Sequence, residues 1–452
     1  MYSTPPAGAT DQGKKIDDLP EVWAPDDYPR TMPSFLAAST QRHGPIFRVR
    51  WSDAPGVVHM VGPEANKLIL HTQRECFSHE LGWTPVLGEY FGKGLLNMDG
   101  EEHTRHRKMM NPAFTIAYMS RYLPLMMQVI ERRTSDWARR GQVDLYDEAR
   151  KMTFDIAAEA LVGFNAGPQV DRLRALFLTL LNGDFGPNLT QEQWWQAITP
   201  IHDELRSMLL ELIARRRAEI APEGGPTNIL EMMIRARDDE GQALTDEQLL
   251  AHVNILLVAG HETSTSMAAW LLYLLTTHPT HLARVHAELD QTLGHEQAPI
   301  TLEAVKAMRV LGDALSEAGR LHSPVGTAPR QVVREVQFGG YTLPVGTPIY
   351  YCIAAGHRLP TVFEQPDRFD PDRFAPPREE DKRTPYGFIP FGGGTRICIG
   401  INFAQVEIKA MAAHLLRHYT LHPIGGQDIV QTYYGVTRFL PEGARVGVTR
   451  RA

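Results

Sequence analysis

The segment from Thr245 to Pro279 has the apolar pattern of one long helix, and it constrains the fold more than any other stretch. Thr245 and Gln248 form a capping box at its start, and Pro279 marks its end. At about 1.5 Å per residue this helix would run roughly 50 Å, enough to cross a whole domain. We therefore expect a mainly α-helical domain built around it.

A polar stretch, residues 260–266, interrupts this helix between two apolar flanks and argues against a transmembrane span. Glycine in a helix interior costs up to about 1 kcal/mol relative to alanine, and hydroxyl groups compete for backbone carbonyls. For residues 264–266 we favour a satisfied polar patch. For the others the functional interpretation is that Gly260 lets a ligand approach, while Glu262 and Thr263 hold water and relay protons.

A glycine-rich loop, Phe391-Gly-Gly-Gly-Thr-Arg-Ile-Cys-Ile-Gly400, surrounds Cys398. Its glycines let the backbone turn tightly and approach a planar ring. Arg396 places a fixed positive charge near a cofactor carboxylate or a thiolate. A buried free cysteine is the alternative, but the length of the pattern favours a thiolate held against a flat, anionic cofactor.

The loop pattern Phe-x-x-Gly-x-Arg-x-Cys-x-Gly resembles the heme-binding loop of the cytochrome P450 superfamily. The resemblance implies heme b as the cofactor, with Cys398 as the axial thiolate ligand of the iron. Phe391 and Arg396 are then expected among the heme-binding residues.

The polar stretch of the long helix extends the resemblance. Ala259-Gly-His-Glu-Thr263 is similar to the family's oxygen-activation motif, in which an acid–alcohol pair delivers protons. Glu262 and Thr263 are thus expected to be catalytic, Gly260 to lie against the heme, and His261 to face away from it. Because peroxide-driven relatives tend to lack this pair, its presence favours dioxygen chemistry.

Two charged motifs precede the cysteine loop. Glu317-x-x-Arg320 places an acid and a base on one helical face, and residues 370–374, Asp-Pro-Asp-Arg-Phe, follow in a Pro-rich coil. This order resembles the family's ExxR helix and meander, which implies a buried structural network of Glu317, Arg320 and Arg373. A near repeat of the second motif leaves Arg368 as an alternative to Arg373.

Basic residues follow Asp99 in a predicted helix over residues 99–108. His103 and Arg107 share one face at i, i+4, and the resemblance implies that they bind heme propionates, as does Arg330. Many relatives have Trp at the position of His103, and others have His.

The other basic side chains of this region, Arg105 and Lys108, are interpreted as a solvated face. With the surface around Arg396, they would form a positive patch that suits an acidic redox partner.

Length and charge exclude several classes of protein. The chain has 452 residues and a net charge of −7, which argues against nucleic-acid binding. Residues 1–20 hold no apolar anchor, and three widely spaced cysteines suit a reducing cytosol. We expect a cytoplasmic monomer without a membrane anchor, with a loose tail at residues 1–18 and one heme domain over residues 19–452.

Apolar periodicity predicts mainly helices with a small β portion, and the resemblance implies the triangular-prism fold of cytochrome P450. The predicted helices are Arg121–Arg139, Gln142–Val162, Thr199–Ile220 and Ile401–Tyr419, and the predicted strands are Ile46–Trp51, Val57–Val61 and Ile349–Ile353. The expected substrate-pocket segments are Trp83–Phe91, Phe177–Phe185, Val253–Ala259, Val325–Ala328 and Tyr433–Val436.

These observations predict a heme-thiolate monooxygenase that inserts one oxygen atom from O₂ into a lipophilic small molecule such as a fatty acid, terpenoid or steroid. Its electrons would come from a separate ferredoxin- or flavodoxin-type donor with its reductase. Two alternatives stay open: a peroxide-dependent hydroxylase on the same scaffold and a non-catalytic heme-binding protein. His59 is the one polar residue that the strand 57–61 offers near the expected channel mouth, which weakens a free-acid substrate.

Overall fold

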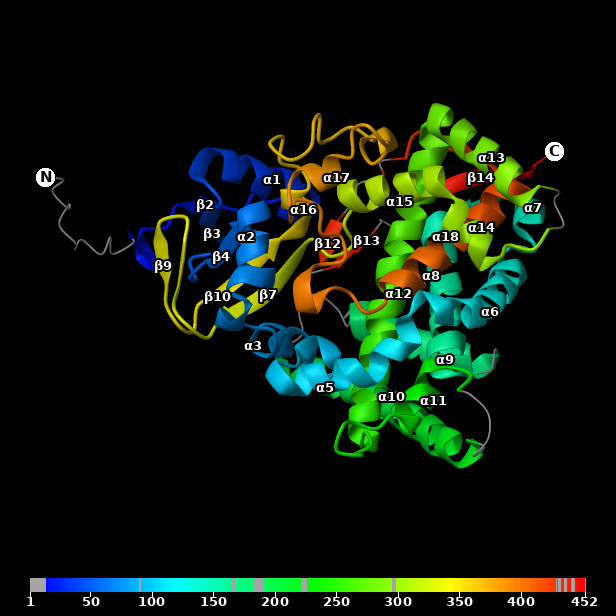
Figure 1. The fold of residues 1–452 in the computed structure, drawn as a ribbon, viewed down its shortest axis with the longest axis horizontal. Coiled ribbons are helices and arrows are strands. Elements are labelled where there is room, and N and C mark those ends of the chain that lie inside the picture. Colours follow the sequence, from blue (N-terminus) through cyan, green and yellow to red (C-terminus); the bar gives the residue numbers. More distant parts are fainter. Residues whose placement is uncertain are drawn as a thin grey trace, which may run out of the picture.

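Helices make up most of the structure, and the largest sheet lies on the side of the N-terminus (Figure 1). The computed structural model describes residues 14–88, 91–164, 167–182, 191–220, 226–294, 298–427, 429, 432–434, 437–439 and 444–451. The longer helices are α1 (Tyr28–His43), α5 (Gly100–Met110), α6 (Ile116–Thr134), α8 (Leu145–Ile156), α9 (Pro168–Asn182), α10 (Gln191–Glu219), α12 (Asp246–Thr277), α13 (Pro279–Leu293), α15 (Arg309–Leu321) and α18 (Ile401–His418). The shorter ones are α2 (Pro63–Lys67), α3 (Glu80–Trp83), α7 (Trp137–Arg140), α11 (Ile229–Arg235), α14 (Leu302–Ala307), α16 (Ile353–Gly356) and α17 (Glu380–Arg383).

The long predicted helix is α12, which runs through the middle of the molecule (Figure 1). The Thr245 hydroxyl accepts a hydrogen bond from the Gln248 N–H at 3.2 Å, and the Gln248 side chain accepts from the Thr245 N–H at 3.0 Å, so the predicted capping box is confirmed. Most of the helix is buried against α8, α15 and α18. Among the described helices, none is long and apolar enough to cross a membrane.

A mixed sheet of six strands forms the N-terminal side. Its order is β2 (Glu21–Trp23), β3 (Ile46–Arg50), β4 (Val57–Val61), β10 (Pro348–Cys352), β7 (Thr327–Val332) and β5 (Phe77–Ser78). The three predicted strands are therefore present as β3, β4 and β10. Parallel pairing of β4 with β10, in which Val58 lies opposite Ile349, joins two segments far apart in sequence. It also fixes β7, which carries Arg330.

Smaller sheets pair the remaining described strands. They are β1 (Lys14–Lys15), β9 (Tyr341–Leu343) and β8 (Val336–Phe338); β11 (Tyr419–Pro423), β14 (Arg445–Arg450) and β6 (Gln142–Asp144); and β12 (Thr432–Tyr434) with β13 (Thr437–Phe439). Some predictions differ from this arrangement, such as the helix Arg121–Arg139, which is divided between α6 and α7. Lys14 and Lys15, placed in the loose tail, pair with β9. The helix predicted to start at Gln142 starts at Leu145, because the Asp144 carboxylate accepts the N–H groups of the first turn and ends the strand there.

A buried acid lies where α18 packs against α12. Glu407 of α18 is 0% exposed, and within the described residues neither carboxylate oxygen has a well-formed hydrogen bond. Burial raises the pKa of Glu407 to about 8, with Ser264 of α12 opposing the shift. The carboxyl group is therefore neutral at pH 7, which avoids an unpaired charge in the core.

This acid predicts a pH-dependent difference between the wild type and Glu407→Gln. The folded state keeps a proton that the unfolded state releases near pH 4.5, so the contribution of Glu407 to stability falls by about 1.4 kcal/mol per pH unit as pH rises toward 8. Glutamine stays neutral throughout. The melting temperature of the variant relative to the wild type should rise between pH 5 and pH 8, and a difference independent of pH would contradict a buried neutral acid.

Candidate active site

A buried ion network lies behind the cysteine loop. Glu317 and Arg320 of α15, and Arg373 from the coil, are each 0% exposed. Two nitrogens of Arg320 lie 2.6 and 2.8 Å from the Glu317 carboxylate, and Arg373 Nε lies 3.0 Å from it. Glu380 accepts a further hydrogen bond from Arg373 at 2.7 Å. Both guanidinium groups are thus neutralised inside the protein.

The structure distinguishes the two candidate arginines of the coil. Arg368 is exposed and contributes only its backbone carbonyl, which accepts from Arg320 and Arg373 at 3.3 Å each. The side chain that reaches Glu317 belongs to Arg373. Arg320 also donates to the carbonyl of His357, whose ring accepts the Ile389 N–H at 2.9 Å. The network therefore reaches the segment that enters the cysteine loop.

Glycines set the path of the cysteine loop. Gly392 and Gly394 have φ of 72° and 61°, a region that favours glycine. A Cβ at Gly394 would lie 2.1 Å from the carbonyl oxygen of Leu70, so this close approach also requires glycine. The Cys398 N–H donates to the carbonyl of Phe391 at 2.8 Å and closes the loop.

Cys398 is exposed, whereas Cys76 and Cys352 are buried. Although Cys398 as a whole residue is exposed, its thiol is desolvated, which raises the pKa, while the Gly400 N–H and the charge of Arg107 oppose the shift. A metal cation bound to the sulfur would reverse this balance, because a coordinated thiol loses its proton.

On the facing helix, the accessible positions surround Ala259. Ala259 is exposed in a helix whose other residues are mostly buried, and the Thr263 hydroxyl donates to its carbonyl at 2.7 Å. Gly260 corrects our prediction, because a Cβ there would lie 3.2 Å from Leu161 rather than in the accessible space. Gly260 thus permits close packing between helices, and Ala259 is the residue that would lie against a ligand.

Glu262 points toward α8. Its carboxylate accepts from the Tyr146 hydroxyl at 2.9 Å and lies 3.4 Å from Arg150 Nε and 3.1 Å from His261 Nε2. Burial raises the pKa of Glu262, but His261, Arg150 and Tyr146 outweigh it and lower the pKa overall. The acid is therefore ionised and held away from the Thr263 hydroxyl. His261 also bonds the Leu257 carbonyl at 2.6 Å, so it packs into the core.

The predicted propionate residues converge from three elements: α5, β7 and the cysteine loop. His103 is 5% exposed, and burial together with Arg396 and Arg107 lowers its pKa to about 4. Burial, Arg330 and Arg107 lower the pKa of Arg396 to about 10, with Asp99 opposing. Burial is the larger cause of both shifts, and the neighbouring cations add to it, so several positive groups lie close together here.

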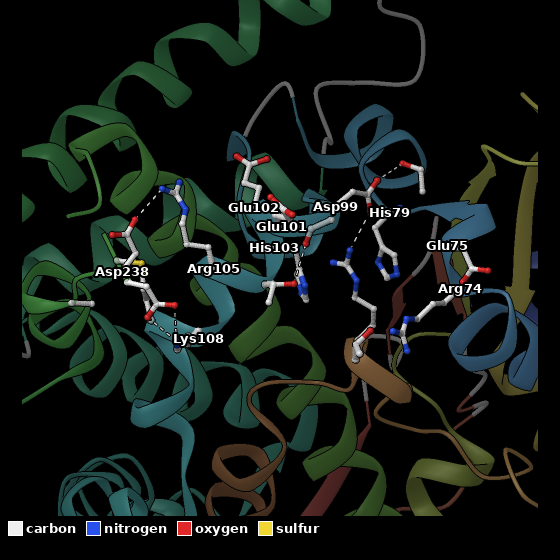
Figure 2. Close-up of a pocket in the computed structure, with 18 of the residues that line it drawn as sticks. Arg74, Glu75, His79, Asp99, Glu101, Glu102, His103, Arg105, Lys108 and Asp238 are labelled. Atoms are coloured by element: carbon white, nitrogen blue, oxygen red, sulfur yellow. Dashed lines mark hydrogen bonds and ion pairs between the residues drawn. The ribbon is translucent and has the colours of Figure 1, made fainter. Parts of the chain in front are cut away.

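Unpaired donors mark where an anion fits. Among the described residues, Arg330 Nε, Arg396 NH1 and His79 Nδ1 are buried without a hydrogen-bond partner. Asp99 compensates part of this charge, because its carboxylate accepts from Arg396 at 3.1 Å and from the backbone N–H of His79 at 2.9 Å (Figure 2). A cofactor with two carboxylates would satisfy the remaining donors.

A sequence model of the family described as Cytochrome P450 matches residues 20–443. The chain belongs to the cytochrome P450 family. Cytochrome P450 136 of Mycobacterium tuberculosis is 32% identical over 397 residues, which cover 86% of this chain and 78% of that protein. Cytochrome P450 120 of Synechocystis sp. is 31% identical over 396 residues and 86% of each chain. The solved structure of retinoic acid-bound cyanobacterial CYP120A1 matches with a TM-score of 0.85 and 27% identity, over 97% of this chain and 100% of that one.

These comparisons confirm the fold, the heme b cofactor and the cytochrome P450 monooxygenase class predicted from the sequence. The residues present fit this cofactor. A thiol lies at the expected loop position, an exposed alanine lies on the facing helix, and cationic donors lie where two carboxylates could bind.

Several residues of the site escaped the sequence analysis. Asp99 is the N-cap residue of α5, but its side chain makes no cap hydrogen bond and binds Arg396 instead. His79, Tyr146 and Arg150 belong to no motif, and only the tertiary structure brings them to their partners. The exposure of Ala259 could have been predicted, because Ala259 is the small residue next to Gly260 in the sequence.

The predicted positive patch is wrong as stated. Arg105 NH1 lies 3.2 Å from Asp238, and Lys108 Nζ lies 2.7 Å from Asp239. Two acids that are distant in sequence therefore neutralise both cations.

The ion network predicts a sharp contrast between two neighbouring arginines. Arg373→Ala would leave Glu317 and Glu380 with unmatched buried charge, which costs about 3–5 kcal/mol. Arg368→Ala is the matched control, because only its backbone takes part. We expect heme-poor protein with a lowered melting temperature for Arg373→Ala and Glu317→Ala, and normal heme content for Arg368→Ala. Equal behaviour of the two arginine variants would contradict the network.

Proposed function

We propose that this cytochrome P450 inserts one oxygen atom from O₂ into a lipophilic small molecule, with electrons from a separate ferredoxin- or flavodoxin-type protein and its reductase. Cytoplasmic location and a monomeric state are part of this proposal. The observation that carries it is the Thr263 hydroxyl on the accessible side of α12, beside exposed Ala259. That position suits proton delivery during dioxygen activation.

This proposal includes a role for each of the individual residues of the site. The heme supplies thiolate-ligated iron, which activates oxygen. Cys398 would ligate that iron, while His103, Arg107, Arg330 and Arg396 would hold the propionates and Phe391 would lie against the heme. Thr263 would hold a water molecule and pass protons inward.

Glu262 would supply protons to this relay from the buried side of α12. In the structure its carboxylate contacts Tyr146 and Arg150. The acid must therefore leave these partners before it exchanges protons with the water at Thr263.

The proposed substrate class rests on residue 59, where no charged side chain is available to bind a charged group of the substrate. His59, the polar residue of β4, is buried, stacks on Phe47, and has its pKa lowered to about 4 by burial. It is therefore neutral at pH 7 and supports a substrate bound by apolar contact. The retinoic acid bound to CYP120A1 is lipophilic but carries a carboxylate, so it supports the lipophilic class and does not bear on the lack of a charged anchor. Parts of the predicted pocket, residues 89–90, 183–185 and 435–436, lie outside the described residues.

The iron ligand can be tested by spectroscopy. The reduced protein under carbon monoxide should show the red-shifted Soret band of thiolate-ligated heme, because a thiolate pushes electron density toward the iron. Cys398→His should lose the band, while Cys76→Ser and Cys352→Ser, the two buried cysteines, are controls that should keep it. Loss of the band in a control, with retention in Cys398→His, would refute the assignment.

The proton relay predicts uncoupling in Thr263→Ala. Groups of this kind contribute roughly 10²–10⁴-fold to proton transfer. The variant should keep its heme spectra and still consume NAD(P)H, with electrons diverted to peroxide or superoxide. The measurement is product formed per NAD(P)H consumed, and Thr265→Ala, whose hydroxyl is buried against Thr153, is the matched control. An unchanged ratio in Thr263→Ala would exclude this hydroxyl as the relay.

A further inference from the structure

An acidic turn, residues 238–240, contacts two basic side chains of α5, and Figure 2 shows Asp238 of this turn beside Arg105. Asp238 accepts a hydrogen bond from Arg105 at 3.2 Å, and both carboxylate oxygens of Asp239 lie 2.7–2.8 Å from Lys108 Nζ. The turn therefore occupies the two cations that a negatively charged protein would use to dock beside the cysteine loop.

The turn is held in place by its own backbone. The second oxygen of Asp238 accepts the N–H groups of Glu240 at 3.0 Å and Gln242 at 2.7 Å. Gly241 closes the turn with φ of 79°. Asp238 is only 6% exposed at its side chain, so it fixes the shape of the turn. Asp239 contributes charge without shaping the turn, and its side chain can be changed separately.

Arg105 and Lys108 differ in their freedom to move. Arg105 also donates to His106 Nε2 at 3.1 Å, so the neutral His106 carries its proton on Nδ1 and donates to His252 Nε2 at 2.8 Å. Both histidines are buried. Moving Arg105 would remove the donor that hydrogen-bonds to His106 Nε2. Lys108 is 68% exposed at its side chain and is the cation that a partner can reach.

The turn lines the same cavity as part of the cysteine loop. A cavity of about 1320 Å³ is lined by α5, the turn, Thr395 and Arg396, two residues from Cys398. Six Arg and Lys residues and seven Asp and Glu residues line it, and three of the seven acids belong to the turn. Without the turn the lining would be cationic, and with it the charges nearly balance.

We propose that the acidic turn is an internal competitor for an acidic electron-donor protein, and that Asp239 must release Lys108 before the donor can bind it. This inference rests on the proposed function, because it assigns a ferredoxin-type donor to this surface. An exposed ion pair is weak enough for a partner to displace. The competition should lower the association rate and make affinity depend on salt.

The test uses the full-length, heme-loaded protein and a plant-type [2Fe–2S] ferredoxin with an acidic surface as the probe. At low salt, Asp239→Asn should bind this ferredoxin roughly threefold to fivefold more tightly than the wild type. Lys108→Ala should remove that gain in the double variant. Glu204→Gln is the control, because it makes the same charge change in an exposed ion pair with Arg172, away from the cavity.

Equal affinity of the wild type and Asp239→Asn would overturn the inference, as would an equal gain in Glu204→Gln or no ferredoxin binding by any variant. Product formation is measured separately with the same ferredoxin and its reductase. Product without an affinity difference would reject the competitor and leave the proposed function intact. An affinity difference without product formation would support the competition at Lys108 and count against the proposed function.

Discussion

A buried guanidinium group needs an anion close to it, and this requirement organises the structure. Arg320 and Arg373 meet it inside the protein, because Glu317 lies between them and Glu380 takes a further hydrogen bond from Arg373. Arg330, from β7, is buried as deeply but keeps a nitrogen without a partner among the described residues. The first two arginines are neutralised within the protein, and Arg330 keeps a donor that a cofactor carboxylate could bind.

The internal network also determines where the reactive loop lies. Arg320 holds the carbonyl of His357, whose ring holds Ile389, and the chain then enters the glycine turns that end at Cys398. Helix α18 begins three residues later and packs against α12. One buried carboxylate, Glu317, is thereby connected through a short series of contacts to the cysteine loop.

Local patterns were enough to predict α12 with its cap, strands β3, β4 and β10, and the family. Those features depend on residues close in sequence, such as Thr245 with Gln248, or on a short motif such as the one around Cys398. Apart from the start of α8, which the neighbouring Asp144 sets, and the break between α6 and α7, the errors involve partners distant in sequence. The acids that neutralise Arg105 and Lys108 come from the turn after α11, more than a hundred residues away. The direction of Gly260 depends on its packing against Leu161, which helical periodicity alone does not fix.

The central claim, that the unmatched cations around Arg330 and Arg396 form a carboxylate site for heme, can be tested from the side of the cofactor. The measurement is the affinity of the apoprotein for iron protoporphyrin IX and for its dimethyl ester, which lacks both negative charges. Charge-assisted hydrogen bonds are worth about 1.5–3 kcal/mol each, so the ester should bind at least about tenfold more weakly. In Arg330→Met the ratio should shrink. Equal affinity of the wild type for both porphyrins would contradict a carboxylate site at these cations.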